Sequence, residues 1–167
     1  MYRLQRKGEQ GKVKHSSLIT LHPYTRELCH EFWRCYVADF DMLEKSYIYD
    51  EATTNRYFDK MSADESRRLF VICLEARAIG EIQLKRIDFE KGCATMSVHL
   101  ANDTFKNRGY GTEAEQLIIA YAFHELGLHT LYADCVHRNK RSAHVLEKVG
   151  FTFTHEDDVL RYYVLNA

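Results

Sequence analysis

Seven residues, Lys106 to Thr112 with the sequence KNRGYGT, constrain this chain more than any other stretch. Gly109 and Gly111 flank a tyrosine, and an apolar helical pattern over residues 113–126 follows directly. Glycines before a helix let the backbone turn sharply, and the first helical turn offers unpaired N–H groups at the positive end of the helix dipole. The stretch therefore predicts a phosphate-binding loop. A tight turn without a ligand would give the same short pattern, so the rest of the chain decides.

The length of 167 residues predicts one domain spanning residues 1–167, and 46% hydrophobic with 13% aromatic residues indicates a globular chain. The formal net charge of -1 gives no electrostatic reason to expect a nucleic-acid or membrane partner. The five cysteines form no CxxC pair, which favours reduced thiols in the cytoplasm and no metal site. We expect no signal peptide, because residues 1–15 are polar, and no membrane span, because no apolar run is long enough.

Apolar periodicity predicts the order of strands and helices along the chain. We expect strands over residues 17–22, 69–74, 78–87, 93–100, 130–136, 151–154 and 160–165. We expect helices over residues 25–37, 51–61 and 113–126, and a last helix from Asn139 to Gly150. Thr25, Asp50 and Asn139 can cap three of these helices. The short connections from 69 to 100 predict an antiparallel meander, and the strand–helix–strand order that follows predicts a right-handed crossover between parallel strands. The fold class is therefore α/β, with a closing hairpin.

Two segments about one strand apart carry the most specific motifs. The first is Lys106-Asn107-Arg108-Gly109-Tyr110-Gly111-Thr112-Glu113-Ala114, and the second joins Asn139-Lys140-Arg141-Ser142-Ala143 to Glu147-Lys148-Val149-Gly150-Phe151. The first resembles the acetyl-CoA signature of the GNAT N-acetyltransferases, a Gln/Arg-x-x-Gly-x-Gly/Ala loop before a helix. The second resembles their Asn-capped helix that ends in Gly-Phe, and it looks most like that of the ribosomal-protein N-terminal acetyltransferase branch.

The resemblance implies a fold, a cosubstrate and a reaction. The fold would be α/β (α+β), with a mixed central sheet of about six to seven strands, an antiparallel N-terminal meander, splayed parallel strands at the crossover and helices on both faces. The chain would move the acetyl group of acetyl-CoA to a primary amine by direct attack. The acceptor would be a protein or peptide N-terminus or a small-molecule amine, and the resemblance leaves a homodimer open.

The cofactor contacts of the family carry over onto matching residues. The loop backbone would hold the CoA pyrophosphate, although Lys106 stands where the family prefers Gln or Arg. The loop candidates are Lys106, Asn107, Arg108, Gly109, Tyr110, Gly111 and Thr112. The other candidates are Val98, Leu100, Asn139, Arg141 and Ser142. Backbone groups near Val98 and Leu100 would pair with the pantetheine arm and polarise the thioester carbonyl. Lys140 and Arg141 would either reach the 3′-phosphate or be solvated.

Acetyl transfer needs a group that takes a proton from the amine and one that gives a proton to the leaving thiolate. Glu81 is the first candidate base, because family members often carry a glutamate on that strand that acts through water. A solvated outer carboxylate would give the same sequence pattern. His99 is the second candidate base, on the opposite face of its strand from Val98 and Leu100.

The acid is harder to assign. Many family members use a tyrosine of the second segment, but Leu146 occupies the matching position. Ser142 is the candidate in its place, as in the ribosomal-protein branch, and close helix packing would explain a small residue equally well. Tyr162 or Tyr163 is a further candidate, and only one of them can point into the site because neighbours on a strand face opposite ways.

Three functions compete at this point. The leading prediction is an acetyl-CoA-dependent N-acetyltransferase, and the alternative is a catalytically silent acyl-CoA-binding module of the same fold, which the missing tyrosine favours. A nucleotide-binding enzyme of another type is disfavoured, because the Walker lysine and GxGxxG are absent. Residues 24–65 would select the acceptor, and acids there would either attract a cationic amine or belong to an ordinary surface. These acids are Asp39, Asp41, Glu44, Asp50 and Glu51.

Overall fold

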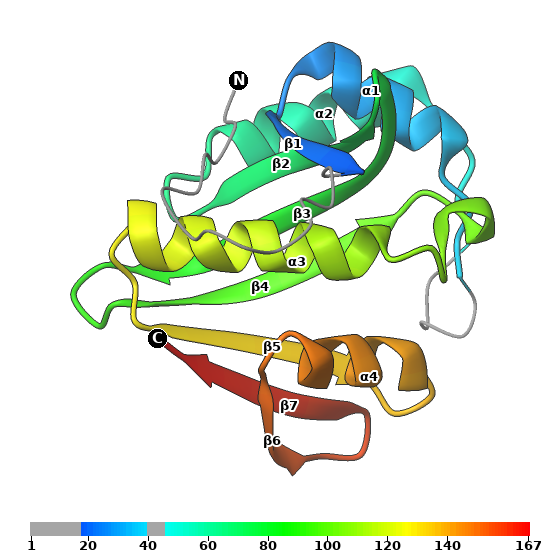
Figure 1. The fold of residues 1–167 in the computed structure, drawn as a ribbon. Helices are drawn as coiled ribbons and strands as arrows, with labels where there is room; N and C mark the ends of the chain where they lie inside the picture. The colour runs from blue at the N-terminus through cyan, green and yellow to red at the C-terminus, as the bar shows by residue number, and fades with distance from the viewer. Residues whose placement is uncertain (1–17, 40–45) are drawn as a thin grey trace, which may run out of the picture.

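A computed structural model describes residues 18–39 and 46–167. Over these residues the chain forms one seven-stranded sheet, with the strand order β1-β2-β3-β4-β5-β7-β6, and four α-helices (Figure 1). The strands are β1 (Ile19–Pro23), β2 (Arg68–Leu74), β3 (Arg77–Asp88), β4 (Cys93–Leu100), β5 (Thr130–Val136), β6 (Thr152–Glu156) and β7 (Leu160–Asn166). The helices are α1 (Arg26–Cys35), α2 (Glu51–Ser62), α3 (Tyr110–Ala120) and α4 (Lys140–Lys148). The predicted α/β fold class is confirmed.

The pairing of the strands follows the predicted topology. Strands β1 to β4 pair consecutively and antiparallel, which is the expected meander. Helix α3 then carries the chain to β5, which pairs parallel with β4. Strand β7 pairs antiparallel with both β5 and β6, so the last two strands form the expected hairpin. The polar residues 1–15 lie outside the described part of the chain.

The parallel strands β4 and β5 are joined only at one end. Their pairing covers three residue pairs, from Cys93 with Thr130 to Thr95 with Tyr132. Beyond Thr95, β4 stays paired with β3 up to Leu100, whereas β5 stays paired with β7 up to Val136. Each strand therefore follows its antiparallel neighbour, and the sheet opens between them. The splay that the family resemblance implied is confirmed.

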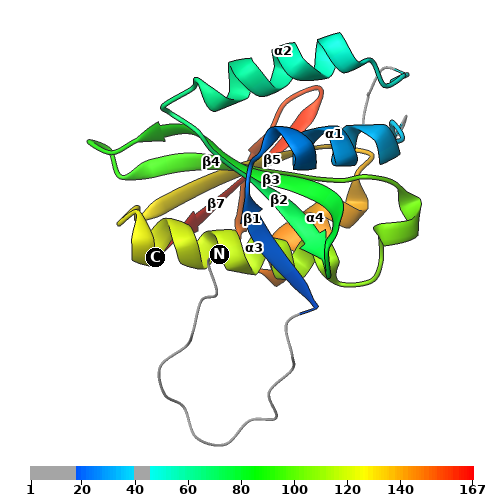
Figure 2. The same cartoon turned by 90° about the horizontal axis from the view of Figure 1, so that it is seen from above.

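Helices cover both faces of the sheet, as Figure 2 shows from above. Helices α1 and α2 lie on one face, and α3 and α4 lie on the other. Large apolar side chains that are fully covered fill the layers on either side of the strands. They include Phe32, Ile72, Ile79, Ile82, Leu84, Ile118 and Leu131. Burying one such side chain stabilises the fold by about 1.5–3 kcal/mol relative to leaving it in water.

Side-chain caps begin three of the helices where the sequence predicts them. The caps are Thr25 before α1, Asp50 before α2 and Asn139 before α4. Each side-chain oxygen accepts a hydrogen bond from the backbone N–H three residues further on, at 2.7–3.3 Å. Helix α1 ends two residues earlier than predicted, because Val37 N donates to Ala101 O at 2.7 Å and so turns the chain toward the end of β4.

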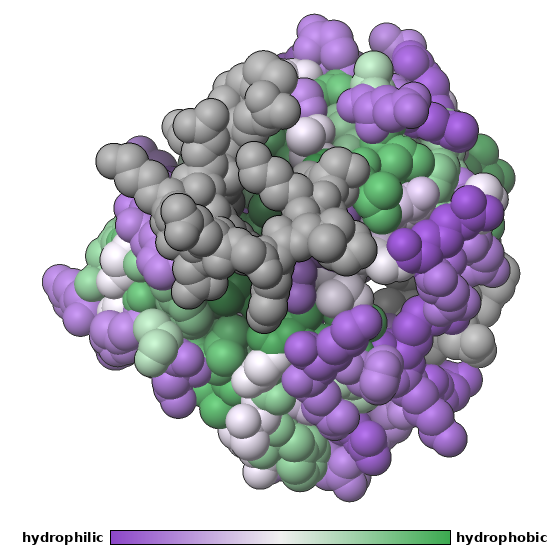
Figure 3. Space-filling model, viewed as in Figure 1, coloured by the Kyte–Doolittle hydropathy of each residue, from purple (hydrophilic) through white to green (hydrophobic). Residues whose placement is uncertain are grey.

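Helix α3 begins differently from the prediction. Gly109, with a φ of 86°, precedes the helix, and Tyr110 is its first residue, so Gly111 lies inside the first turn. Within the part of the chain that the structure describes, no side chain caps this helix. At its other end, α3 continues into a π-helical turn over Tyr121–Glu125, and Glu125 is exposed although its spacing placed it on the inner stripe. Hydrophilic residues gather over α4 in the view of Figure 3.

Candidate active site

The opening between β4 and β5 forms a slot of about 140 Å³. Past Thr95, the edge of β4 that faces β5 has no strand partner among residues 18–39 and 46–167, so its backbone groups on that side are available to an extended ligand. The slot also receives side chains from α3 and α4. Its lining residues are Met96, Ser97, Val98, His99, Glu115, Ala133, Asp134, Cys135, Val136, Asn139, Ser142, Leu146 and Leu160.

The slot passes through the sheet from one face to the other. His99 lies directly opposite Glu81, whose partners come from the α1 and α2 side, so His99 is on that side as well. Glu115 and Leu146 line the slot from the other side, because α3 and α4 cover that face. A ligand in the slot would therefore have one end under α3 and α4 and the other end under α1 and α2.

The KNRGYGT loop lies where β4 ends and α3 begins. A Cβ atom on Gly111 would be 3.9 Å from Leu100 Cδ1, which places the first turn of α3 against the last residue of β4. Tyr110, Gly111 and Thr112 are half-buried, while Asn107, Arg108 and Gly109 are exposed. Because no side chain caps α3, its first backbone N–H groups point outward at the positive end of the helix dipole. The loop thus has the chemistry of an anion site beside the slot.

Lys106 does not extend from this loop toward solvent. Its amino group binds the carboxylate of Asp39 and lies 2.7 Å from Asp103 Oδ1, and the side chain is 13% exposed. Asp39 follows α1 in the chain, so Lys106 links the loop to the α1 side of the molecule. In this arrangement the Lys106 amino group is engaged by two carboxylates.

The start of α4 forms the other side of the slot. Asn139 and Ser142 both line it, and the Asn139 side chain also caps the helix, so the cap does not remove it from the site. Arg141 and Lys140 are exposed and lie outside the slot lining. Leu146 is 3% exposed and lines the slot, so the position where many relatives carry a tyrosine presents only hydrocarbon here.

Glu81 is buried next to the slot and not solvated. Its side chain is 2% exposed, and the alternative of an outer carboxylate is therefore wrong. Burial raises the pKa of Glu81 to about 7, although a hydrogen bond from Tyr24 and the charge of His99 both lower it. Because His99 lines the slot and lies opposite Glu81, the two candidate bases form one adjacent pair.

Two tyrosines hold the Glu81 carboxyl from the α1 and α2 side. The Tyr24 hydroxyl donates to Oε1, and the Tyr57 hydroxyl donates to Oε2 at 3.3 Å. The Tyr24 hydroxyl also lies 3.0 Å from Cys29 Sγ, so the thiol packs beside the Tyr24–Glu81 contact. Burial raises the pKa of both tyrosines, so both stay protonated at neutral pH.

An aromatic cluster extends from Tyr57 over this part of the α1 and α2 layer. Trp33 stacks edge-on against Tyr57, with ring centroids 5.2 Å apart. Tyr36 and Tyr47 pack on the same indole ring at 4.9 Å each. Of the acids expected to attract an amine, Asp39 binds Lys106 and Asp50 caps α2, while Asp41 and Glu44 lie outside the described residues. The acids that do line the slot are Asp134 on β5 and Glu115 on α3.

The two tyrosines of β7 point in opposite directions, as expected. Tyr163 is 1% exposed, whereas Tyr162 donates to Asp157 Oδ2 at 2.7 Å and stacks on His155 at the surface. Tyr163 is the tyrosine of β7 nearer the slot, because it contacts Cys135, which lines the slot. Burial raises the pKa of the Cys135 thiol, and hydrogen bonds with Ser142 and Tyr163 partly offset that effect.

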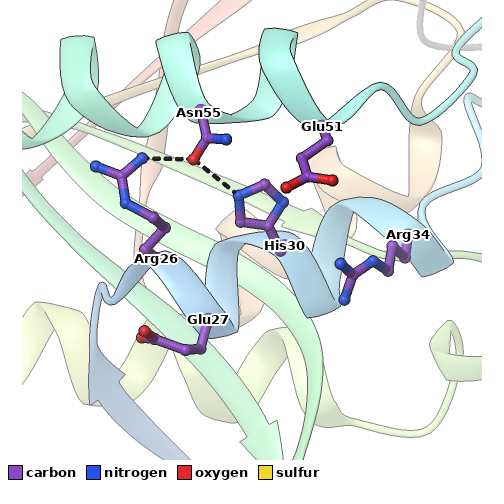
Figure 4. Close-up of a pocket in the computed structure, with 6 residues that line it drawn as sticks. All are labelled: Arg26, Glu27, His30, Arg34, Glu51 and Asn55. Atoms are coloured by element: carbon purple, nitrogen blue, oxygen red, sulfur yellow. Dashed lines mark hydrogen bonds between the residues drawn. The ribbon is translucent and has the colours of Figure 1, made fainter.

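A second and wider hollow, of about 410 Å³, lies between α1 and α2 on the outside of the molecule (Figure 4). Asn55 stands at its centre and accepts hydrogen bonds from Arg26, at 2.6 Å, and from His30, at 3.1 Å. His30 is also 2.8 Å from the Tyr49 hydroxyl. The polar groups of this hollow therefore bind one another and hold α1 and α2 together. None of the residues that the sequence selected for catalysis or cofactor binding lies in it.

The comparisons with known proteins agree with this geometry. The family model of the acetyltransferase (GNAT) domain matches residues 19–152. This chain belongs to the GNAT acetyltransferases. It is 31% identical over 133 residues to the probable N-acetyltransferase YjcK of Bacillus subtilis, a match that covers 77% of this chain and 72% of that one. It is 26% identical over 110 residues to the spermidine N(1)-acetyltransferase of Escherichia coli K12, which covers 66% of this chain and 58% of that enzyme.

A solved structure extends the agreement to the fold of this GNAT enzyme. The spermidine N-acetyltransferase of Vibrio cholerae, in complex with CoA and spermine, superposes with a TM-score of 0.71 at 18% identity over 90% of this chain and 96% of that one. The enzyme is an acetyl-CoA-dependent N-acyltransferase, and acetyl-CoA is its cosubstrate. The finer resemblance to the ribosomal-protein branch is not confirmed, because the relatives found are spermidine and other N-acetyltransferases. Nothing in the comparisons supports the silent module.

Other expectations for this GNAT enzyme concern absences. No helix in the described part of the chain is both long and apolar enough to cross a membrane. Within residues 18–39 and 46–167 there is no group of three or more His, Cys, Asp or Glu side chains suited to hold a metal ion. The cytoplasmic location and the homodimer stay predictions.

Sequence reasoning missed three residues of this region. Tyr24 and Tyr57 hold Glu81, but the sequence assigned their segment, residues 24–65, to acceptor selection and named neither as a site residue. Nothing in their spacing connects them to a strand so far along the chain. Glu115 was also missed, although it offered a signal. It stands between Ala114 and Ile118 on the buried side of α3, where an acid is unusual unless it is paired.

Proposed function

We propose that this enzyme acetylates a primary amine of a small, cationic molecule of the polyamine class, using acetyl-CoA held in the slot between β4 and β5. Two relatives named above are described as spermidine acetyltransferases, and one of them is described with CoA and spermine. The observation that carries the proposal is the position of His99, which lines the slot and lies opposite the buried Glu81. His99 thereby connects the slot, which would hold acetyl-CoA, with Glu81, which would accept the proton.

The cofactor half of the proposal assigns the KNRGYGT loop to the pyrophosphate. Uncapped N–H groups of Tyr110, Gly111 and Thr112 would bind it, since the helix dipole favours an anion at this end. The unpaired edge of β4 at Val98 and Leu100 would bind the pantetheine arm by its backbone, with Asn139 on the facing wall. Arg141, exposed at the start of α4, would be the charged partner of the 3′-phosphate.

The proton-transfer half assigns the base to Glu81 and His99. Acetyl-CoA supplies the acetyl group, which the amine nitrogen takes by direct attack on the thioester. A base with a pKa near 7 is well matched to neutral pH, because it is partly ionised and still basic. Glu81 is too deeply buried to reach the amine itself, so His99, or a water beside it, would pass the proton to the carboxylate.

For the leaving thiolate we assign Ser142, because Leu146 cannot donate a proton. Ser142 lines the slot at the start of α4. Its hydroxyl is within the hydrogen-bonded group that contains Cys135 and Tyr163, and Tyr163 stays protonated because burial raises its pKa.

The acceptor half rests on aromatic and acidic groups on the α1 and α2 side. Electron-rich rings of Trp33, Tyr36 and Tyr47 attract alkylammonium groups by cation–π interaction, worth about 0.5–2 kcal/mol each. Asp134 on β5 lines the slot and would attract a second positive charge. A long, multiply charged amine fits this combination better than an amino acid side chain or a neutral amine.

A turnover assay over a panel of amines tests the proposal, with release of the CoA thiol as the readout. The panel contains spermidine, spermine, a monoamine of similar length and a peptide with a free N-terminus. We expect kcat/KM for spermidine or spermine to exceed that for the monoamine and the peptide by at least about tenfold, the factor of one good charged contact. A preference for the peptide would overturn the assignment of the acceptor.

A further inference from the structure

Glu115 is the one slot-lining carboxyl on the α3 side, and it lies in apolar surroundings. The residue is 2% exposed, and its side chain reaches the slot one turn after Gly111. Met96, Ala133 and Leu146 line the same slot. Beside these apolar side chains, a carboxyl has no evident packing advantage over a leucine of similar size. The polar residues Asn139 and Ser142 of the slot come from the start of α4.

The carboxyl is also unsatisfied. Its Oε2 atom is buried and has no hydrogen-bond partner among the described residues. Buried polar atoms in folded proteins nearly always have a partner, because an unpaired one loses its hydration without compensation. An exception that faces a ligand slot is explained most simply by a partner that arrives with the ligand.

The protonation state of Glu115 fixes what this partner can be. Burial alone raises the pKa of Glu115 to about 8, so the group is mainly the neutral acid at pH 7. The other titratable groups that line the slot are His99, Asp134 and Cys135. A carboxylic acid carries one O–H donor and one carbonyl acceptor, whereas a carboxylate only accepts. The group therefore suits a neutral ligand with amide groups better than a phosphate.

The geometry points to Glu115 as a cofactor-binding residue, whose neutral carboxyl donates a hydrogen bond to an amide carbonyl of the pantetheine arm in the slot. This inference rests on the proposed placement of acetyl-CoA between β4 and β5. It assigns Glu115 a contact separate from the loop, which would bind the phosphates, and separate from Glu81, which would take the proton. The ligand class that Glu115 selects is a neutral, amide-containing chain.

Calorimetric titration of CoA into the folded enzyme and two Glu115 variants tests the contact. Glu115→Leu removes both donor and acceptor, and we expect it to weaken CoA binding by about tenfold, the typical value of one hydrogen bond. Glu115→Gln keeps one donor and one acceptor in nearly the same shape, and we expect affinity within about threefold of the unchanged enzyme. The matched control is Gln116→Leu, which adds the same side chain at an exposed position of α3 and should leave the affinity unchanged.

A second ligand separates this contact from a general disturbance of the site. The nucleotide 3′-phospho-ADP has the phosphates of CoA and lacks the pantetheine arm, so Glu115→Leu should bind it as tightly as the unchanged enzyme does. Equal weakening of both ligands, or no weakening of CoA, would overturn the assignment of Glu115. Gly111→Glu distinguishes a wrong placement of the cofactor from a wrong role for Glu115. If it also leaves CoA affinity unchanged, the proposed placement of the cofactor has failed; if it abolishes binding while Glu115→Leu does nothing, only the role of Glu115 has failed.

Discussion

Glu81 and Glu115 are equally buried carboxyls on opposite faces of the sheet, and they differ in what holds them. Each is 2% exposed, and burial raises the pKa of each, to about 7 for Glu81 and about 8 for Glu115. Glu81 has two tyrosine hydroxyls and a histidine as neighbours, whereas Glu115 Oε2 has no partner in the described structure. Burial alone thus does not assign a role. A carboxyl with partners is suited to exchange a proton, and one without them is suited to meet a ligand.

The largest expected difference between the two carboxyls is in turnover. Glu81→Gln removes the proton acceptor while keeping the shape, and we expect kcat to fall by about 10²–10⁴-fold, the usual contribution of a general base. CoA affinity should stay within about threefold, since the amide still accepts from Tyr24 and Tyr57. Steady-state kinetics and calorimetry measure both quantities.

A matched control for Glu81→Gln is Glu31→Gln, which changes a carboxylate that accepts from Ala78 N at 3.0 Å outside the slot. Its kcat should be nearly unchanged. If both variants lose activity equally, the loss reflects packing of the α1 and α2 layer. Glu81 would then not be the base, and the catalytic difference between Glu81 and Glu115 would be wrong.

The second expected effect is in the pH profile of kcat/KM. A base with a pKa of about 7 must be ionised to accept the amine proton, so activity should fall about tenfold per pH unit below pH 7. Glu81→Gln should lose this limb, and Glu115→Gln should retain it. A limb that persists in Glu81→Gln would assign the base to His99 alone.

The third expected effect is a change in folding stability, and it concerns Glu115, whereas the first two concern Glu81 and activity. Between its ordinary pKa of 4.5 and about 8, Glu115 binds one more proton in the folded chain than in the unfolded chain. The free energy of unfolding therefore falls as pH rises through this window and levels off above it. Glu115→Leu removes this loss, so the variant should be more stable than the unchanged enzyme at pH 7, by about 3 kcal/mol at 1.36 kcal/mol per pKa unit.

Denaturant unfolding of Glu115→Leu at several pH values measures this gap in stability. We expect the pH-dependent part of the difference in unfolding free energy to disappear below about pH 4.5, where the carboxyl is neutral in both the folded and the unfolded chain. A gap that stays constant from pH 4 to pH 8 would mean that the Glu115 pKa is not raised in the folded chain.

The smallest effect isolates one partner of Glu81. Tyr57→Phe removes a hydroxyl that donates to Oε2 at 3.3 Å and lowers the pKa of Glu81. The pKa read from the rate profile should rise by a few tenths of a unit, since a long, neutral hydrogen bond is weak. An unchanged profile would show that Tyr57 does not influence the protonation of this carboxyl.

The sequence predicted the parts of this molecule that depend on local chemistry. A helix cap and an alternating strand each depend on only a few neighbouring residues. The caps Thr25, Asp50 and Asn139 and the strand at 93–100 are all found where expected. The splay came from the family resemblance, and the pairing of β4 with β3 and of β5 with β7 gives its physical cause.

What could not be predicted depends on contacts between distant segments. The burial of Glu81 requires Tyr24 and Tyr57, which are 57 and 24 residues away in sequence. The engagement of Lys106 with Asp39 likewise joins residues 67 apart. The start of α3 was misplaced for a different reason. A glycine pair before a helix does not reveal which glycine adopts the positive φ, and here it is Gly109 while Gly111 is helical.

The division of the sheet has a consequence for how the chain acquires its structure during synthesis. Strands β1 to β4 pair with their immediate successors, so this half can form its backbone ladder before β5 leaves the ribosome. Strands β5 to β7 join it through three residue pairs and the packing of α3 and α4. We expect the N-terminal half to be protected first in pulse-labelled hydrogen exchange. The slot, which needs walls from both halves, would then be the last feature of the enzyme to form.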